Sequence, residues 1–307
     1  MSPILIFVYN RPFHTLETLK ALKLNIGADK ANVIIYSDGP KSEKDYTLVN
    51  DVRNICRNVS GFGSLTLIER PQNIGLANNI ISAVSYEIRK YGTVIVLEDD
   101  LITSVGFIKF MNDALEFYKN SEIFSICGYS PKISIPDSYI HSTYLTPRIG
   151  SWGWASWEEK WKQVDWDVKD FDVFINDSNA RNTFNKGGND LTTMLLRQKL
   201  NQIDSWAIRF TYSCFRSGNM VVYPMKSLVK NIGVDGTGTH MKKSLKYDSP
   251  IINTIDEKLF CPLNVVNTDI LEQFGLSNST SILRKVINYF KLKAYIFRLD
   301  LKSHFVI

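Results

Sequence analysis

The chain has 307 residues, 44% of them hydrophobic, which is enough for one large α/β domain or two smaller ones and argues against disorder. Its net charge of +5 is uneven, because residues 282–307 hold six basic side chains against one acid and so account for the whole excess. The remaining body is close to neutral. A nucleic-acid-binding protein would show a distributed basic surface, so we expect no nucleic-acid partner.

The four cysteines are far apart and form neither a CxxC pair nor a zinc-ligand spacing, so neither a disulfide framework nor a zinc site is predicted. The N-terminus enters an apolar, strand-like segment without a basic region or cleavage site, and we expect no signal peptide. No apolar stretch reaches the roughly 18 residues of a membrane-spanning helix. These features favour a cytoplasmic protein.

Up to residue 100, short apolar runs alternate with segments whose apolar residues recur at helical spacing. The runs are 4–9, 33–37, 65–69 and 94–97, and the helical segments are 13–24, 43–56 and 76–90. Fully apolar runs are typical of strands buried on both faces of a parallel sheet. The alternation predicts right-handed βαβ units in a doubly wound sheet.

A polar segment follows each of these apolar runs, and ligands of such sheets bind beyond the carboxyl ends of the strands. The four segments are Asn10–Pro12, Ser37–Pro40, Arg70–Asn73 and Glu98–Asp100. No GxGxxG follows the first run and no GxxxxGKS occurs, so the phosphate cradles of dinucleotide-binding domains and P-loop NTPases are missing.

Three consecutive acids, Glu98, Asp99 and Asp100, end the fourth run. Each makes its neighbours harder to ionise, and a divalent cation such as Mn²⁺ or Mg²⁺ would relieve that repulsion and could bridge the acids to a diphosphate. The alternative is that Asp99 and Asp100 only favour the start of a helix near Ser104 through its dipole.

After Cys127 the segments become longer, less regular and rich in aromatics, as in residues 151–161. Residues 189–201 are predicted to form a helix capped by Asn189, and residues 205–217 a second one closed by Gly218. Residues 220–223 look like a last strand.

The ordered set Asn10-Arg11, Ser37-Asp38-Gly39 and Glu98-Asp99-Asp100 resembles the GT-A glycosyltransferases. The closest parallel is the inverting N-acetylglucosaminyltransferase I group with the bacterial sugar transferases that share its pattern. The resemblance covers Pro3 to about His240. It implies an α/β GT-A (Rossmann-like) fold, with a mostly parallel sheet and helices on both faces. Residues 1–127 would bind the nucleotide sugar, 128–265 the acceptor and the catalytic base, and 266–307 would form a basic amphipathic tail.

The resemblance also implies roles for individual residues at the donor site. Asp100 would hold Mn²⁺ or Mg²⁺, Asp99 would reach the ribose and Glu98 the transferred sugar. Base contacts fall on Arg11, Asp38 and Asn79, although the animal enzymes have His at the last of these. From the sequence alone, Arg11 can equally be a surface cation, Asp38 a turn residue and Asn79 a solvated helix position.

Three further residues are assigned in the second half. Asp204, in Asp204-Ser205-Trp206, resembles the base that deprotonates the acceptor hydroxyl, though it can instead charge the first turn of a helix. His240 would touch the diphosphate or the metal, or is an ordinary loop histidine. Trp154 would touch a sugar, although large aromatics are more often core residues.

The tail has apolar residues at helical spacing surrounded by lysines and arginines, the pattern of a helix lying on an anionic membrane surface. These residues are Leu283, Val286, Ile287, Phe290, Ala294, Phe297, Leu301 and Phe305. Docking of this helix on the body or on a second subunit is an equal alternative.

Together these patterns predict a metal-dependent inverting glycosyltransferase that uses a nucleotide sugar, most simply a UDP-sugar. Its acceptor would be a glycan or lipid-linked oligosaccharide in bacterial surface polysaccharide or lipopolysaccharide synthesis, at the inner face of the cytoplasmic membrane. The rivals are a sugar nucleotidyltransferase, which would need a glycine-rich, arginine-containing loop after the first strand, and a non-catalytic carbohydrate-binding protein of the same fold.

Overall fold

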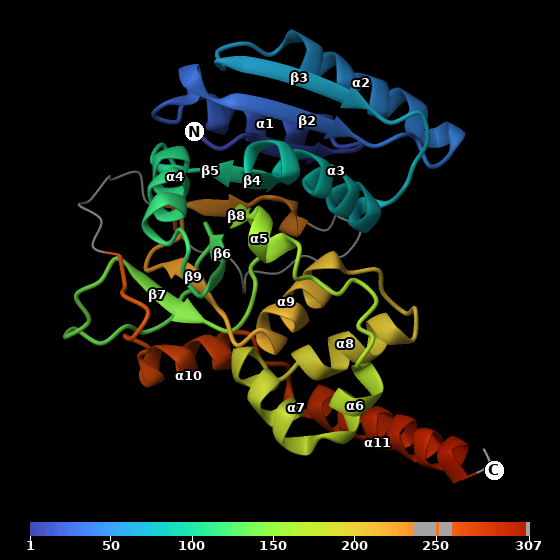
Figure 1. Cartoon of the computed structure of the whole chain (residues 1–307). Coiled ribbons are helices and arrows are strands. Elements are labelled where there is room, and N and C mark those ends of the chain that lie inside the picture. Colours follow the sequence, from blue (N-terminus) through green and yellow to red (C-terminus); the bar gives the residue numbers. More distant parts are fainter. Residues whose placement is uncertain (236–249, 252–259, 305–307) are drawn as a thin grey trace.

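A computed structural model describes residues 1–235, 250–251 and 260–304, and it confirms an α/β fold built on a mostly parallel sheet (Figure 1). The eight strands lie in the order β3 (Ser64–Glu69), β2 (Asn32–Ser37), β1 (Ile4–Val8), β4 (Thr93–Glu98), β8 (Trp154–Trp157), β6 (Ile123–Cys127), β9 (Met220–Pro224) and β7 (Thr143–Thr146). Only β8 and β7 run antiparallel to their neighbours. The four predicted apolar runs are thus β1 to β4.

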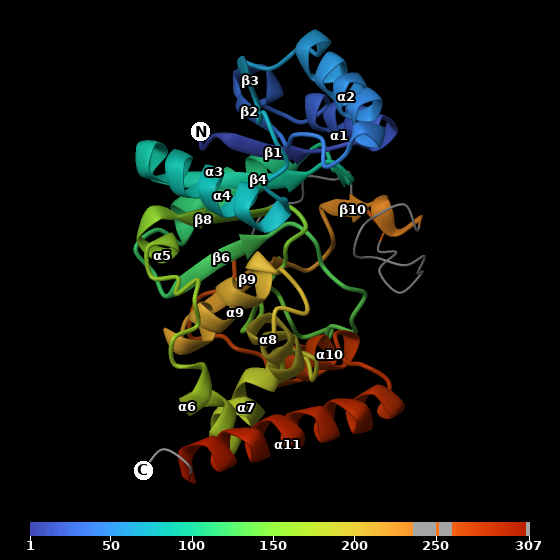
Figure 2. The same cartoon turned by 90° about the vertical axis from the view of Figure 1, so that its right-hand side faces the viewer.

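Helices cover both faces of the sheet because successive strand residues point to opposite sides. Ile4 and Ile6 pack with α1 (Pro12–Lys23), α2 (Tyr46–Asn58) and α4 (Phe107–Phe117), whereas Leu5 and Phe7 pack with helices on the other face. The helices of that other face are α3 (Leu76–Tyr91), α5 (Glu158–Trp161), α9 (Trp206–Arg216) and α10 (Thr268–Ser277). Figure 2 shows α1 and α2 on one side of β1 to β3 and α3 on the other.

The two helices predicted in the second half, α8 and α9, begin two residues and one residue later than the sequence suggests. Helix α8 spans Leu191–Lys199. The expectation that Asn189 caps it is wrong, because Asn189 Oδ1 instead accepts hydrogen bonds from the backbone N–H and the hydroxyl of Thr280, at 2.9 and 3.1 Å. Helix α9 is capped by Ser205, whose Oγ accepts from Ile208 N, and Gly218 follows its end with a left-handed φ of 70°.

A separate helical layer lies beside the sheet. It contains α6 (Phe171–Asn176), α7 (Ser178–Phe184), α8 and the outer side of α9, and its buried residues form a third apolar cluster. The C-terminal helix α11 (Ile282–His304) lies across this layer, as both Figure 1 and Figure 2 show. No helix within the described ranges is long and apolar enough to cross a membrane.

A short antiparallel ribbon lies beside the end of β4. It pairs β5 (Leu101–Thr103) with β10 (Val229–Asn231), and η4 (Gly233–Asp235) follows directly. The other single-turn helices are η1 (Ala28–Lys30), η2 (Glu43–Asp45) and η3 (Asn185–Gly187). The ribbon brings residues 229–235 to the acids that follow β4.

Candidate functional site

The three acids lie where the sequence predicts, at the carboxyl end of β4. Glu98 is the last residue of the strand, and Asp99 and Asp100 form the turn into β5. In the register of the sheet Glu98 lies beside Phe7 of β1, so residues 9–12 after β1 reach the same edge. The acids therefore face the segment that carries Arg11.

Arg11 is the cation of this cluster. Its Nη2 lies 2.6 Å from Asp99 Oδ1 and 2.5 Å from Asp100 Oδ2, and its side chain is only 16% exposed. Burial acts to lower the pKa of Arg11, but the charges of Asp99 and Asp100 outweigh it and raise that pKa. Arg11 is therefore not a free surface cation.

The charged form of the Glu98 carboxyl is disfavoured by its surroundings. Within the described ranges its carboxyl has no hydrogen-bond or ion-pair partner, and burial together with the charges of Asp100 and Asp99 raises its pKa to about 8, which Arg11 only partly opposes. Burial also raises the pKa of Asp99, against the effect of Arg11. One guanidinium thus balances only part of the charge that three carboxylates would carry.

The loop after β10 is fastened to Asp100 from the other side. Asn231 Nδ2 donates to Asp100 Oδ1 at 3.3 Å, and its own Oδ1 accepts from Gly233 N at 2.7 Å. The backbone N–H of Ile232 donates to the carbonyl of Asp100 at 2.8 Å. A Cβ at Gly233 would overlap Asp100 Oδ2 and lie 2.8 Å from Arg11 Nη1, so only glycine fits. The sequence resemblance includes the segment Asn231-Ile232-Gly233 but assigns no role to Asn231, and the structure places its side chain in contact with Asp100.

This donor set fits Mn²⁺ or Mg²⁺ in its chemistry, because it offers crowded carboxylate oxygens with an incomplete counter-charge. It is not a complete cage: among the residues that the structure describes, no three His, Cys, Asp or Glu side chains converge as a metal site. A cation held by Asp100 would therefore need ligands from water or from a bound diphosphate.

The carboxylate of Asp38 is already bound by backbone groups and is not the free side chain expected of a base contact. It is 5% exposed, and its carboxylate accepts backbone N–H groups from Gly39 (2.9 Å), Ile74 (3.0 Å) and Gly75 (3.1 Å). These bonds hold the turn after β2 against the loop that leads into α3. Asp38 thus shapes the edge of the sheet, and a contact with a nucleotide base stays a prediction.

Asn79 is buried in the first turns of α3, not solvated as one alternative had it. Its Oδ1 accepts from Arg70 Nε at 3.3 Å, and the Arg70 guanidinium lies 5.3 Å from the centre of the Tyr36 ring. Arg70 directly follows β3, so a planar cation and an aromatic ring meet at this part of the edge. The sequence placed Arg70 in a polar rim segment but gave no reason to choose it.

Asp204 lies just before the cap of α9 and is mostly exposed, at 60% of its side chain. Ser205, not Asp204, accepts the capping bond. The Asp204 carboxylate pairs with Arg209 Nη2 at 3.2 Å, and no contact within the described residues joins it to the acids after β4. Its predicted role as the base is not tested by this geometry.

The expectation that Trp154 touches a sugar is wrong. Trp154 is the first residue of β8, is 0% exposed, and stacks on Trp206 (ring centroids 5.0 Å apart) and Trp161 (5.7 Å). A side chain enclosed in this way presents no face to a ligand. His240 lies outside the described residues, so its role stays a prediction.

Comparison with known proteins adds little. No protein-family model matches the chain, and no curated protein is similar in sequence. Among solved structures, TarS of S. aureus matches with 11% identity and a TM-score of 0.37 over 75% of this chain and 36% of TarS, so this chain spans only about a third of that protein. Mouse xyloside xylosyltransferase 1 matches with 10% identity and a TM-score of 0.37 over 69% of this chain and 80% of that one. The galactosyltransferase LgtC, solved with donor and acceptor sugar analogs, matches with 10% identity and a TM-score of 0.33 over 72% of each chain. Similarities this weak establish neither a shared fold nor a shared function.

Proposed function

We propose that this protein is a GT-A glycosyltransferase that transfers a sugar from a nucleotide sugar, such as a UDP-sugar, with inversion and with the help of Mn²⁺ or Mg²⁺. The observation that carries the proposal is the largely buried cluster Glu98-Asp99-Asp100, which lies at the carboxyl-end edge of the sheet and which Arg11 only partly neutralises. Its acceptor would be a glycan or a lipid-linked oligosaccharide of a bacterial surface polysaccharide or lipopolysaccharide.

The acids and Arg11 divide the donor between them. Asp100 would hold the cation, which when bound supplies positive charge against the leaving nucleoside diphosphate. Asp99 would accept hydrogen bonds from the ribose, and Glu98 from a hydroxyl of the transferred sugar. Arg11 keeps the two aspartates in fixed positions, since one nitrogen contacts both.

The nucleotide base would lie beyond these acids, along the ends of β2 and β3. Asp38 holds the two loops there in register through its three backbone hydrogen bonds. Asn79 orients Arg70 over Tyr36, so the edge offers a planar cation and hydrogen-bond donors to a base. This supports a nucleotide rather than a free sugar phosphate as the ligand.

The transfer step needs a base on the acceptor side of the sugar. The acceptor oxygen forms a bond to the anomeric carbon, the bond from that carbon to the diphosphate oxygen breaks, and the acceptor proton passes to Asp204 Oδ. Arg209 Nη2 lies 3.2 Å from that carboxylate and holds it at the start of α9. Asp204 is exposed enough for an acceptor to reach it.

The decisive experiment is a panel of nucleotide sugars, screened by thermal shift and by release of nucleoside diphosphate, with and without Mn²⁺. A transferase releases nucleoside diphosphate slowly in water and faster with its acceptor. Formation or consumption of pyrophosphate would instead indicate a nucleotidyltransferase. Sugar binding without any turnover would indicate a binding protein. Either result would overturn the proposal.

The assignment of Asp204 has its own test. Asp204→Asn should lower transfer by about a hundredfold or more while the thermal shift caused by the donor stays as in the unaltered protein. Asp51→Asn, another exposed aspartate, on α2, is the matched control and should transfer normally. An active Asp204→Asn variant would move the base elsewhere without affecting the donor site.

A further inference from the structure

Helix α11 has two apolar faces on opposite sides. One face is docked, because Leu292, Tyr295, Ile296 and Leu299 pack against the cluster formed by α6 to α9. Tyr295 also packs edge-on against Phe171, with ring centroids 5.8 Å apart, and its hydroxyl donates to Asp172 Oδ1 at 3.4 Å. This docking fixes the rotation of the helix about its own axis.

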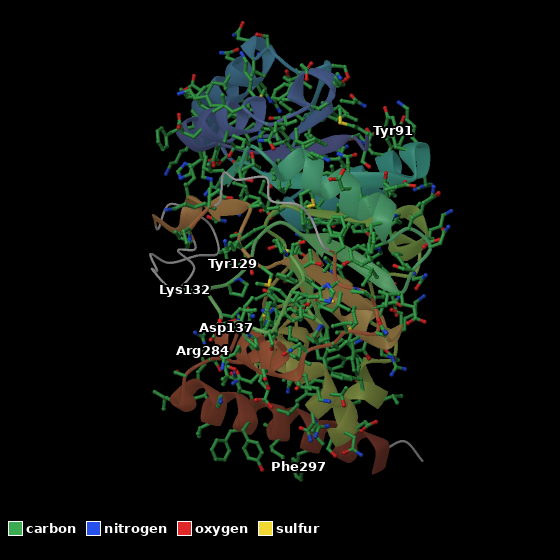
Figure 3. All side chains as sticks on the ribbon, turned by 90° about the vertical axis from the view of Figure 1, so that its left-hand side faces the viewer. Tyr91, Tyr129, Lys132, Asp137, Arg284 and Phe297 are labelled. Carbon is green, nitrogen blue, oxygen red and sulfur yellow. The ribbon has the colours of Figure 1, made fainter. Side chains whose placement is uncertain are left out.

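The other face consists of large apolar side chains that remain exposed. Measured as exposed fractions, Leu283 is at 73%, Phe290 at 65%, Phe297 at 62%, Val286 at 48% and Ile287 at 45%. We call these five residues the outer face. Positions 283, 290 and 297 are seven apart and so line one side of the helix. Figure 3 shows Phe297 on the side of α11 that faces away from the body.

Basic side chains border this outer face. Arg284, Lys291 and Lys293 are exposed, and none of them takes part in an ion pair within the described residues. Lys293 lies over the Tyr289 ring, 5.7 Å from its centre. Since residues 282–307 hold the entire net charge of the chain, the positive potential is concentrated on this one helix.

We propose that the outer face of α11 binds the surface of an anionic lipid bilayer, with the helix lying in the plane of the interface and the body held through the docked face. Apolar side chains would enter the boundary between headgroups and acyl chains, and the bordering lysines and arginine would meet lipid phosphates. The two equal alternatives from the sequence, a membrane helix and a docked helix, thus describe two faces of one element.

A second copy of this chain fits the outer face poorly. Pairing two α11 helices through it would bring together two segments that each carry a net charge of +5, and this repulsion opposes association. An anionic bilayer offers both apolar depth and negative charge. The proposal does not depend on the sugar-transfer function.

The position of α11 is suited to this contact. Both views place it at the end of the molecule farthest from β3, where no other labelled element lies outside it (Figure 1, Figure 2). In Figure 2 its N-terminal end is on the same side as β10. A bilayer under α11 would therefore meet the molecule along one end.

The test is flotation of the full chain with vesicles of phosphatidylcholine alone and with vesicles that also contain phosphatidylglycerol. We expect binding only to the anionic vesicles. The triple variant Leu283→Gln, Phe290→Gln and Phe297→Gln should bind at least about tenfold more weakly, because each substitution removes one apolar side chain from the contact with the bilayer. Binding to both kinds of vesicle alike, or to neither, would overturn the proposal.

A matched triple variant controls for the loss of exposed apolar surface as such. Tyr86→Gln, Val173→Gln and Leu276→Gln alter side chains that are 66%, 73% and 66% exposed on α3, α6 and α10. This control should float like the unaltered chain, with both triple variants melting at the same temperature as it does. If both triple variants lost vesicle binding equally, the outer face would not be a specific membrane-binding surface.

The charges are tested separately. Lys291→Gln with Lys293→Gln should weaken binding to the anionic vesicles about thirtyfold, with a smaller dependence on salt. The release of nucleoside diphosphate from a donor in the absence of vesicles should be the same for all these variants, so a failed anchor is distinguishable from a failed donor site. Lipid-free dimerisation that the outer-face variant abolishes would overturn the proposal in favour of a second copy.

Discussion

Arg11 Nη2 lies 2.5 Å from Asp100 Oδ2, and this ion pair joins the end of β1 to the turn after β4. The two residues are 89 positions apart in sequence, yet both are mostly buried, with side chains 16% and 14% exposed. The guanidinium is therefore the counter-charge that the fold itself supplies to the acids. A cation bound at Asp100 would share this carboxylate with Arg11.

Replacing Arg11 should make the metal-free protein less stable and more responsive to metal. Arg11→Gln leaves Asp99 and Asp100 without their cation, which costs about 3 kcal/mol for a buried pair that loses one partner. Because Mn²⁺ then relieves more repulsion, it should raise the melting temperature of this variant more than that of the unaltered protein. Denaturant unfolding with a chelator and melting with Mn²⁺ measure the two effects.

Arg148→Gln is the matched control, because Arg148 forms an ion pair of similar burial with Asp190 at 2.6 Å, away from the acids. It should lose stability without any larger response to Mn²⁺. An equal response of the two variants would show that Mn²⁺ does not act at the acids after β4.

Removing the last of the three acids should separate metal binding from folding. Asp100→Asn keeps the shape of the side chain but removes the negative charge that would hold a cation. Its hydrogen bond with Asn231 can be kept after a rotation of the amide. We expect the Mn²⁺-dependent thermal shift to disappear and sugar transfer to fall by about a hundredfold or more. Asp190→Asn removes an acid from the other ion pair and should retain both properties.

The sequence predicts the first half of the fold well because local patterns specify it. Continuous apolar runs that end in polar residues gave β1 to β4, and helical spacing gave α1 and α3 within a residue or two. The sequence did not predict strand β8, because its four residues are too few to show a hydrophobic period. Their burial depends on a tertiary contact, the stacking of Trp154 on Trp206.

The candidate site shows the same division. The acids and Arg11 could be placed at one edge from the order of strands, since parallel strands end together. Their pairing could not, because the bonds of Arg11 and of Asn231 to Asp100 span 89 and 131 residues. The first contact depends on how β1 lies beside β4 and the second on how β5 pairs with β10, and no short sequence window contains either pairing.

The close approach of Gly233 to the acids predicts a specific effect of a single methyl group. Gly233→Ala would overlap Asp100 Oδ2 and crowd Arg11, so either the loop or the acids must move. We expect a loss of about 1 to 3 kcal/mol in stability and a weaker response to Mn²⁺. Chemical unfolding and metal titration by thermal shift measure them.

Gly218→Ala provides the comparison, because Gly218 has a left-handed φ of 70° but no neighbouring atoms within 4 Å of an added Cβ. It should lose about 1 kcal/mol through backbone strain alone and keep the full response to Mn²⁺. If both alanine variants respond alike to Mn²⁺, the loop after β10 does not shape the metal site.

Glu98 should make stability depend on pH in the presence of a chelator. Its pKa is about 8 in the folded protein and ordinarily 4.5, so between these values the folded state holds a proton that the unfolded chain has released. Stability from this group therefore falls as the pH rises from about 4.5 to about 8. Glu98→Gln cannot ionise, so its stability relative to the unaltered protein should rise across this window and then level off. Glu272→Gln, on the exposed side of α10, should instead follow the unaltered protein. Unfolding by denaturant at several pH values gives both curves, and parallel curves for Glu98→Gln and Glu272→Gln would mean that Glu98 is already ionised in the folded state.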